Sequence, residues 1–406
     1  MLLAELSIIG MGSAGDGLAL LPDGGRRHIP RALPGETLSP EGRLIRESAE
    51  RVDPPCPHFS LCGACALQHW AGAPQSEWKR GRVEHALRQA GYAQPMVTLG
   101  HVSPPATRRR ADLSVVRNPD GSLTIGFHGP QGVLAIPECR VLRPEIAALL
   151  PRLAAALRPL QALRQRADAA INLLDSGPDI LLRLDGKLTP VDIQRLADFA
   201  RAENLPRIAT REGVAAQIAS VRHGFGRGVV APPPGAFLQA TVDGEAAIIA
   251  GVLAALPARL SRGAIIADLF AGLGTLSFPL SERARVLAYE GDPEATAALD
   301  AGARAAGGRV TAARRDLIRQ PLLPAELAKC AVVVLDPPYA GATEQVAQIA
   351  RGPKPHLVYV SCNPVALERD ARTLHEAGYA LTTATAIDQF LWSPHIEAVV
   401  GFAPAR

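Results

Sequence analysis

Long hydrophobic runs and internal repeats are absent from this sequence of 406 residues. No stretch approaches the roughly 18 consecutive apolar residues that a membrane-spanning helix needs. The first residues, MLLAELSIIGMG, lack a basic leader and carry Glu5 inside their apolar part, unlike a signal peptide. We therefore expect a cytoplasmic protein with no membrane partner and no obligate protein partner. Hydrophobic residues make up 48% of the chain, which excludes disorder. At roughly 150 residues per domain, the length suggests two or three domains.

Lysine is also scarce, with four residues against 39 arginines, and the formal net charge is only +4. A biased genome explains the imbalance better than selection for arginine does. The near balance of charge permits nucleic-acid binding but does not argue for it. Arg108, Arg109 and Arg110 stand together at the edge of a predicted strand, where they would either contact phosphates or form a solvated basic turn. Composition alone thus names no function.

The six cysteines are unevenly spread, and this is the first informative feature. Cys56, Cys62 and Cys65 lie within ten residues, and Cys139 follows far along the chain in IPECR. A large cytoplasmic protein keeps its thiols reduced, so such a cluster indicates metal binding rather than disulfides. Four thiolates bind either zinc or an iron–sulfur cluster. A zinc ribbon usually has two close pairs, and the lone distant cysteine here favours the iron–sulfur cluster.

Three segments of different pattern divide the chain. Residues 1–53 are rich in glycine and proline with short alternating stretches, which predicts a small β domain. The prolines of PPCPH then open a middle region, 54–230, in which strands and helices mix, with a helix expected over 74–92. From 231 to 406, buried strands such as AIIADLF and CAVVVLD alternate with helices. Such alternation predicts an α/β domain, with an open, mostly parallel sheet and helices on both faces.

A glycine-rich turn, DLFAGLGT from Asp268 to Thr275, follows the first of those buried strands. Glycines at a strand-to-helix turn let a nucleotide-like ligand approach the backbone, where amide hydrogens point at it. Glu290, at the end of the next strand, is placed to accept hydrogen bonds from both hydroxyls of a ribose. Only 16 residues separate Gly274 from Glu290, which is short for a dinucleotide fold and fits S-adenosylmethionine better than NAD. A purely structural turn is the alternative.

Two further strand ends carry chemistry. Asp336 begins DPPY, a rigid loop at the carboxyl end of a parallel strand, where α/β sheets place their ligands. DPPY also occurs in methyltransferases that act on amino groups of adenine or cytosine, so the motif is ambiguous. Cys362 ends the following strand, in SCNP, and a thiol beside the predicted cofactor cleft is a candidate nucleophile. A capped turn and a buried structural cysteine are the simpler alternatives.

Together these motifs resemble the family of RNA uracil-5 methyltransferases, in the branch that carries a four-iron–four-sulfur cluster and acts on 23S ribosomal RNA. The resemblance covers nearly the whole chain and rests on PPCPHFSLCGACALQHW, PECRV, PGAFLQAT, DLFAGLGT, DPPYAG, VYVSCNPVALERD and HIEAVVGF. It implies a Rossmann-like class I methyltransferase domain, an α+β central domain that holds the cluster, and an N-terminal β domain of the TRAM or OB type that binds RNA.

The resemblance also implies roles for individual residues. Cys362 matches the family's nucleophile and Glu397 its general base. The residues that match contacts to S-adenosylmethionine are Gln239, Phe270, Thr275, Glu290, Asp316 and Asp336. The residues that match ligands of the cluster are Cys56, Cys62, Cys65 and Cys139.

The chemistry of uracil explains why a thiol and a carboxylate are both needed. Carbon 5 is too weak a nucleophile to take a methyl group directly, but attack of a thiolate on carbon 6 makes an enolate whose carbon 5 does so. A base then removes the proton from carbon 5, and the thiol leaves. The target base has to be flipped out of a helix or already single-stranded to meet the thiol.

The sequence departs from the family in three places. Tyr339 stands where the family often has arginine, and Ala64 replaces a glycine of the cysteine loop. Strands are expected to be missing between Glu36 and Arg51, which would shorten the N-terminal domain. Three alternative functions stay open: methylation of transfer RNA, amino methylation through DPPY without Cys362, and RNA binding by an iron–sulfur protein with a vestigial cofactor site.

Overall fold

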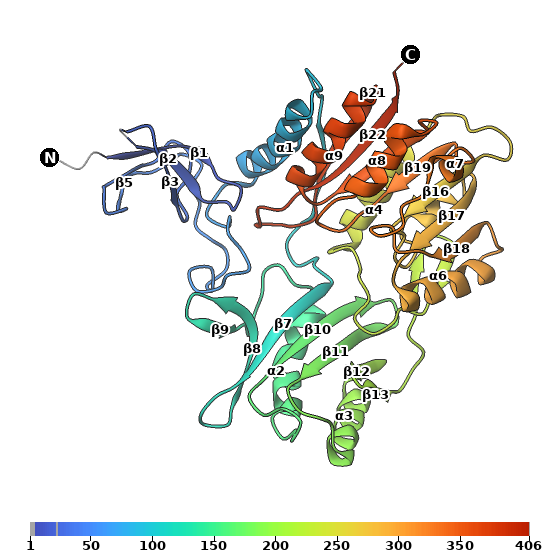
Figure 1. The fold of residues 1–406 in the computed structure, drawn as a ribbon. Helices are drawn as coiled ribbons and strands as arrows, with labels where there is room; N and C mark the ends of the chain where they lie inside the picture. The colour runs from blue at the N-terminus through green and yellow to red at the C-terminus, as the bar shows by residue number, and fades with distance from the viewer. Residues whose placement is uncertain (1–4, 22, 406) are drawn as a thin grey trace.

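The computed structural model describes residues 5–21 and 23–405 of the chain (Figure 1). A five-stranded sheet with the strand order β3-β2-β1-β4-β5 forms an N-terminal unit that extends from one side of the molecule. Its strands are β1 (Leu6–Met11), β2 (Gly17–Leu20), β3 (Arg26–Ile29), β4 (Thr37–Leu38) and β5 (Leu44–Arg46). The stretch between Glu36 and Arg51, where we expected strands to be missing, thus holds β4 and β5. That expectation is wrong: the strands are present, although very short.

A seven-stranded sheet with the order β13-β12-β11-β10-β7-β8-β9 forms the middle of the chain. It is antiparallel except for the β11–β12 pair, as a mixed α+β pattern predicts. Its strands are β7 (Arg110–Arg117), β8 (Leu123–Gly129), β9 (Gly132–Ala135), β10 (Arg166–Leu174), β11 (Gly177–Leu184), β12 (Arg207–Thr210) and β13 (Gly213–Gln217). The helices packed with it are α2 (Pro144–Leu157) and α3 (Pro190–Ala202), and a hairpin of β14 (His223–Phe225) and β15 (Gly228–Val230) follows.

The C-terminal part is built on an eight-stranded sheet with the order β18-β17-β16-β19-β20-β22-β21-β6. The five strands from β18 to β20 are parallel, and β22 runs antiparallel to both β20 and β21. These strands are β16 (Ile265–Leu269), β17 (Arg285–Glu290), β18 (Val310–Arg314), β19 (Val332–Leu335), β20 (His356–Ser361), β21 (Tyr379–Asp388) and β22 (Glu397–Pro404), with β6 (Thr98–Val102) at the edge. The expected open, mostly parallel sheet is confirmed.

Helices cover both faces of this sheet, so its central strands are buried on both sides (Figure 1). They are α4 (Val242–Ala255), α5 (Ser277–Leu280), α6 (Pro293–Ala305), α7 (Pro324–Leu327), α8 (Thr343–Arg351) and α9 (Pro364–Glu376). In β19, Val333 and Leu335 join the apolar cluster under α8 and α9, whereas Val332 and Val334 join the cluster under α4 and α6. Successive side chains of a strand point to opposite faces, and a continuous apolar run therefore fills both cores.

Residues from before position 231 complete this C-terminal layer. Helix α1 (Gly72–Gln89), which we expected over 74–92, packs against α9, and β6 pairs in parallel with β21. The predicted boundary at 231 therefore divides the sequence, but α1 and β6, which come before it, pack with the C-terminal sheet and its helices. Among the described residues, no helix combines the length and the apolar character that crossing a membrane requires.

Candidate active site

A cavity of about 860 Å³ opens where β16, β17, β19 and β20 end. Parallel strands bring their carboxyl ends to one edge of a sheet, so residues far apart in sequence meet there. All eight residues that we predicted to be catalytic or cofactor-binding line this cavity: Gln239, Phe270, Thr275, Glu290, Asp316, Asp336, Cys362 and Glu397. The structure thus brings the whole predicted set together, with Asp316 exposed at the rim.

One end of the cavity is formed by the glycine-rich turn after β16. Gly272 and Gly274 have φ angles of +54° and +93°, a left-handed conformation that glycine adopts without the clash of a β-carbon. The carboxylate of Glu290 accepts hydrogen bonds from the N–H groups of Gly272 and Asp292, both at 2.8 Å. Two backbone donors therefore fix the position of the Glu290 carboxylate at the cavity.

Asp268 is a cavity residue that we did not select from the sequence, although it begins the glycine-rich motif. Its side chain is fully buried and accepts a hydrogen bond from Ser277 Oγ. Its Oδ1 atom has no hydrogen-bond partner among the described residues. Burial raises the pKa of Asp268 to about 7, although the hydrogen bond from Ser277 opposes this, and the charges of Asp336 and Glu290 raise it further. The strand-end position was the signal that would have identified it.

A chain of polar side chains crosses the other end of the cavity. Gln239 donates to Asp336 Oδ2 at 3.4 Å, and Gln389 donates both to Gln239 Oε1 at 2.7 Å and to Glu397 Oε2 at 3.1 Å. The side-chain oxygen of Gln389 accepts the N–H of Ala240 at 2.9 Å, which fixes the orientation of its amide. Sequence reasoning missed Gln389, because its place beside Glu397 follows from strand pairing and from no motif.

Cys362 and Glu397 line the same part of this cavity, at the ends of two paired strands. Strands β20 and β22 pair Ser361 with Ala398. Cys362 directly follows Ser361, just beyond the end of β20, and Glu397 directly precedes Ala398 as the first residue of β22. Burial raises the pKa of the Cys362 thiol to about 12, and the negative charges of Glu397 and Asp336 contribute. Burial, followed by the charge of Asp336, raises the pKa of Glu397 well above its ordinary value. Burial likewise raises the pKa of Asp336 to about 7.

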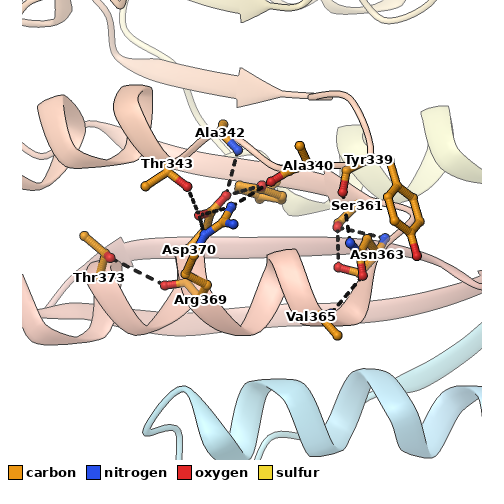
Figure 2. Close-up of polar contacts among 11 residues, drawn as sticks. Tyr339, Ala340, Ala342, Thr343, Ser361, Asn363, Val365, Arg369, Asp370 and Thr373 are labelled. Atoms are coloured by element: carbon orange, nitrogen blue, oxygen red, sulfur yellow. Dashed lines mark hydrogen bonds and ion pairs between the residues drawn. The ribbon is translucent and has the colours of Figure 1, made fainter. Parts of the chain in front are cut away.

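The segment after Cys362 holds the DPPY loop in place, as Figure 2 shows. Asn363 caps α9 by accepting the N–H of Val365 at 3.1 Å, and its side-chain amide donates to the carbonyl of Tyr339 at 2.9 Å. The Tyr339 side chain is 59% exposed at the mouth of the cavity. One residue beside the candidate nucleophile therefore fixes both the start of α9 and the end of the loop.

A second anchor of the same loop is the buried Asp370 of α9 (Figure 2). Its carboxylate accepts hydrogen bonds from the N–H of Ala342 and the hydroxyl of Tyr359, both at 2.7 Å. The neighbouring Arg369 donates to the carbonyl of Ala340 at 2.8 Å and to Asp370 at 2.9 Å. The charge of Asp370 is thus satisfied from several sides, and the residues after DPPY are tied to α9.

The arginine cluster does not behave as a solvated basic turn. Arg109 is buried and forms an ion pair with Glu245 of α4, and its Nε donates to the carbonyl of Gln239 at 3.1 Å. The guanidinium of Arg110 lies over the ring of Phe237, 4.9 Å from its centroid, at the cavity wall. Neither of the two alternatives, a phosphate contact or a solvated turn, holds for Arg109, which instead joins the middle of the chain to the cavity wall.

The four cysteines that we predicted to bind a metal, Cys56, Cys62, Cys65 and Cys139, line a second cavity of about 450 Å³. Burial raises the pKa of the Cys65 thiol to about 12, and the charges of the other three thiolates raise it further. No group of three or more metal-binding side chains among the described residues is arranged to hold an ion. The structure therefore gathers the four thiols around one cavity without showing a metal centre.

The fold is that of class I S-adenosylmethionine-dependent methyltransferases. The crystal structure of the Pyrococcus abyssi tRNA (uracil-54, C5)-methyltransferase with S-adenosyl-L-homocysteine matches 98% of this chain and 99% of that chain with a TM-score of 0.73. Since the two sequences are only 20% identical, this likeness establishes the fold alone.

Sequence comparison is more specific. The chain is 38% identical to an uncharacterized RNA methyltransferase of Brucella suis, over 99% of this chain and 98% of that protein. It is 32% identical to the 23S rRNA (uracil(1939)-C(5))-methyltransferase of Alkalilimnicola ehrlichii, over 98% of this chain and 96% of that protein. A model of the tRNA (uracil-5-)-methyltransferase family matches residues 310–403. The chain belongs to the RNA uracil-5 methyltransferase family.

Proposed function

We propose that this enzyme methylates carbon 5 of a uridine in 23S ribosomal RNA through a covalent intermediate on Cys362. The observation that supports the proposal is that Cys362 and Glu397, which flank the paired residues Ser361 and Ala398, both line the cavity proposed to bind the cofactor. A methyltransferase of amino groups needs no thiol there, whereas carbon-5 methylation needs both a nucleophile and a base. The ribosomal substrate is supported by the 23S rRNA methyltransferase that matches nearly the whole chain.

The cavity fits S-adenosylmethionine by its donor set. Glu290, held by two backbone N–H groups, would accept the ribose hydroxyls, and the glycine-rich turn would lie along the nucleoside. The other residues proposed to contact the cofactor are Gln239, Phe270, Thr275, Asp316 and Asp336. The bound cofactor supplies an electrophilic methyl group and a positive charge. Three carboxyl groups with raised pKa values, those of Asp268, Asp336 and Glu397, suit a site that receives a cation.

The chemical roles of the two catalytic residues follow from where they lie. Cys362 would release its proton to water and attack carbon 6 of the uracil, forming a carbon–sulfur bond and leaving an enolate. Carbon 5 would then take the methyl group as the bond between that group and the sulfur of the cofactor breaks. In its ionised form, Glu397 would remove the proton from carbon 5, and the electron pair released would expel the thiolate of Cys362 from carbon 6. The uracil leaves methylated, with its ring double bond restored.

On this proposal, the thiol should be unreactive until the substrates bind. With a pKa near 12, Cys362 is almost entirely protonated at neutral pH. A cation beside the thiol would lower that pKa, because it stabilises the thiolate. Gln389 has the matching effect on the base: its N–H donates to Glu397 and lowers the pKa of that carboxyl, against the effect of burial.

The second cavity is proposed to hold a four-iron–four-sulfur cluster on Cys56, Cys62, Cys65 and Cys139. The chemistry of the donor set supports this, because four partly buried thiols that repel one another as thiolates become stable ligands around a cationic metal centre. The group would serve structure rather than electron transfer, by organising the RNA-binding surface. The N-terminal sheet is proposed to add only a little RNA affinity, because β4 and β5 are so short.

Release of tritium from RNA labelled at carbon 5 of uridine tests this function, because carbon-5 methylation expels that atom and amino methylation does not. The enzyme should release tritium from a 23S rRNA fragment in a reaction that requires S-adenosylmethionine, and Cys362→Ala should release none. Tritium release from transfer RNA alone would assign the transfer-RNA alternative. Methyl transfer without tritium release, or by Cys362→Ala, would favour amino methylation through DPPY.

A further inference from the structure

The segment that ends at Glu397 is held from outside the sheet to which Glu397 belongs. We call residues 389–396, between β21 and β22, the base loop. Lys79 of α1 donates to Asp388 Oδ2 at 2.7 Å and to the carbonyl of Phe390 at 3.1 Å, at the start of this loop. Asp388 in turn accepts the N–H of Phe390 at 3.1 Å. The start of the base loop is therefore fastened to a helix more than 300 residues away in sequence.

The middle of the base loop is hydrogen-bonded to the residues that directly follow Cys65. Trp392 has a φ angle of +58°, a left-handed conformation that residues with a β-carbon adopt only when their surroundings enforce it. Its carbonyl accepts the N–H groups of Ala66 and Leu67, at 2.9 and 3.0 Å. Arg82 of α1 also donates to the carbonyl of Pro394. Two elements that contribute no atom to the reacting cavity thus fix the conformation of the loop that leads to Glu397.

A buried lysine such as Lys79 is unusual at a position where only stability of the fold is required. Its side chain and that of Asp388 are both fully buried, and apolar residues of similar size stabilise a protein about as well as a buried ion pair does. The ion pair also sets the local backbone conformation. The two hydrogen bonds from Lys79 and the one from the N–H of Phe390 to Asp388 fix the backbone on both sides of Gln389. The amide of Gln389 is then held at 3.1 Å from Glu397 and 2.7 Å from Gln239.

We infer that Lys79 is a positioning residue for the general base: paired with Asp388, it orients Gln389 so that its N–H meets the carboxylate of Glu397. The inference rests on the proposed function, in which Glu397 removes the proton from carbon 5. Lys79 touches no reacting atom, so its loss should leave formation of the carbon–sulfur bond intact. Removal of the carbon-5 proton, and with it release of the RNA, should become slow.

The test uses the pair Lys79→Met/Asp388→Asn in the full-length enzyme, because Lys79→Met alone would leave Asp388 charged and buried without its partner. Three quantities are compared with wild type: affinity for S-adenosylmethionine by calorimetry, the rate of covalent trapping of 5-fluorouridine RNA, and turnover on unmodified RNA. We expect affinity and trapping within about twofold of wild type, turnover at least tenfold lower, and a protein–RNA adduct that accumulates on unmodified RNA. Lys329→Met, at an exposed position, is the matched control and should behave as wild type.

The variant Gln389→Leu tests whether Lys79 and Asp388 act on Glu397 through the side chain of Gln389. It should accumulate the same adduct, and adding it to Lys79→Met/Asp388→Asn should slow turnover no further, since both changes remove the same hydrogen bond to Glu397. Wild-type turnover of Lys79→Met/Asp388→Asn would overturn the inference. An equal loss of trapping and release would also overturn it, because it would show a merely structural role. Failure of the wild-type enzyme to trap 5-fluorouridine RNA would instead overturn the proposed function, and the inference with it.

Discussion

Cys362 directly follows Ser361, and Glu397 directly precedes Ala398, in the antiparallel pairing of Ser361 with Ala398 that ends the contact between β20 and β22. The fold thereby places a thiol and a carboxyl group at the same end of a sheet, in the cavity that the glycine-rich turn also lines. A slip in the register of β20 and β22 would separate the two positions, and it would also turn buried side chains of β22 to the wrong face. The predictions below follow from this arrangement.

Glu290→Ala should weaken binding of S-adenosylmethionine by roughly 1–3 kcal/mol, which is about 5- to 150-fold in Kd, because a charge-assisted hydrogen bond is lost. Asp336→Ala should weaken binding by a similar amount. Titration calorimetry measures both, with Glu282→Ala at an exposed position as the control. Unchanged affinity in both cavity variants would refute the placement of the cofactor.

Alkylation of Cys362 in the enzyme without substrates should be slow at neutral pH and rise about tenfold per pH unit from 7 to 9, because the thiolate reacts and the thiol pKa is near 12. Asp336→Asn should speed alkylation, since loss of a negative charge lowers the pKa of the thiol. The gain should appear above about pH 7, where Asp336 is ionised. Peptide mass spectrometry separates Cys362 from the other cysteines, and Glu344→Gln, on the exposed side of α8, should change nothing.

Asp370→Ala should lower the free energy of unfolding by about 2–5 kcal/mol, because the N–H of Ala342 and the hydroxyl of Tyr359 would lose a buried charged acceptor. Asp370→Asn keeps an acceptor oxygen and should cost less, about 1–2 kcal/mol. Urea unfolding compares the two. Equal losses would mean that the hydrogen bonds shown in Figure 2 do not carry the stability of the DPPY loop.

Anaerobically purified enzyme should be brown and contain about four irons and four sulfides per chain. Cys65→Ser should lose the iron and keep its affinity for S-adenosylmethionine, since the thiols and the cofactor residues line different cavities. Cys330→Ser is the matched control and should keep the iron, because Cys330 is buried in the core of the C-terminal sheet. Colourless protein with one zinc ion per chain would contradict the cluster.

Much of the cavity was predictable because motifs at the ends of parallel strands must meet. Asp336 and Cys362 follow buried strands, Glu290 follows another, and the class I fold that brings them together is confirmed. Residues whose role depends on pairing between distant segments were not predictable. Lys79 lies in a helix with no motif, and its partner comes from the far end of the chain.

The errors have the same physical origin. Arg109 stands in a run of three arginines, a pattern that is compatible with a phosphate contact. Only the fold shows that Arg109 is buried and forms an ion pair with Glu245. The strands between Glu36 and Arg51 are two and three residues long, too short to show the alternation by which strands are recognised. Local pattern thus identified the chemistry at strand ends, whereas partners across the sheet required the structure.

Covalent trapping of RNA that carries 5-fluorouridine is the measurement that tests the central claim most directly. Fluorine cannot leave carbon 5 as a proton does, so the enzyme should remain joined to the RNA, and mass spectrometry should find the methylated nucleotide on Cys362. Cys362→Ala should form no adduct and no product, whereas Glu397→Gln should accumulate an adduct even with unmodified RNA. A Cys362→Ala enzyme that still methylates RNA, or an adduct on another residue, would contradict the account.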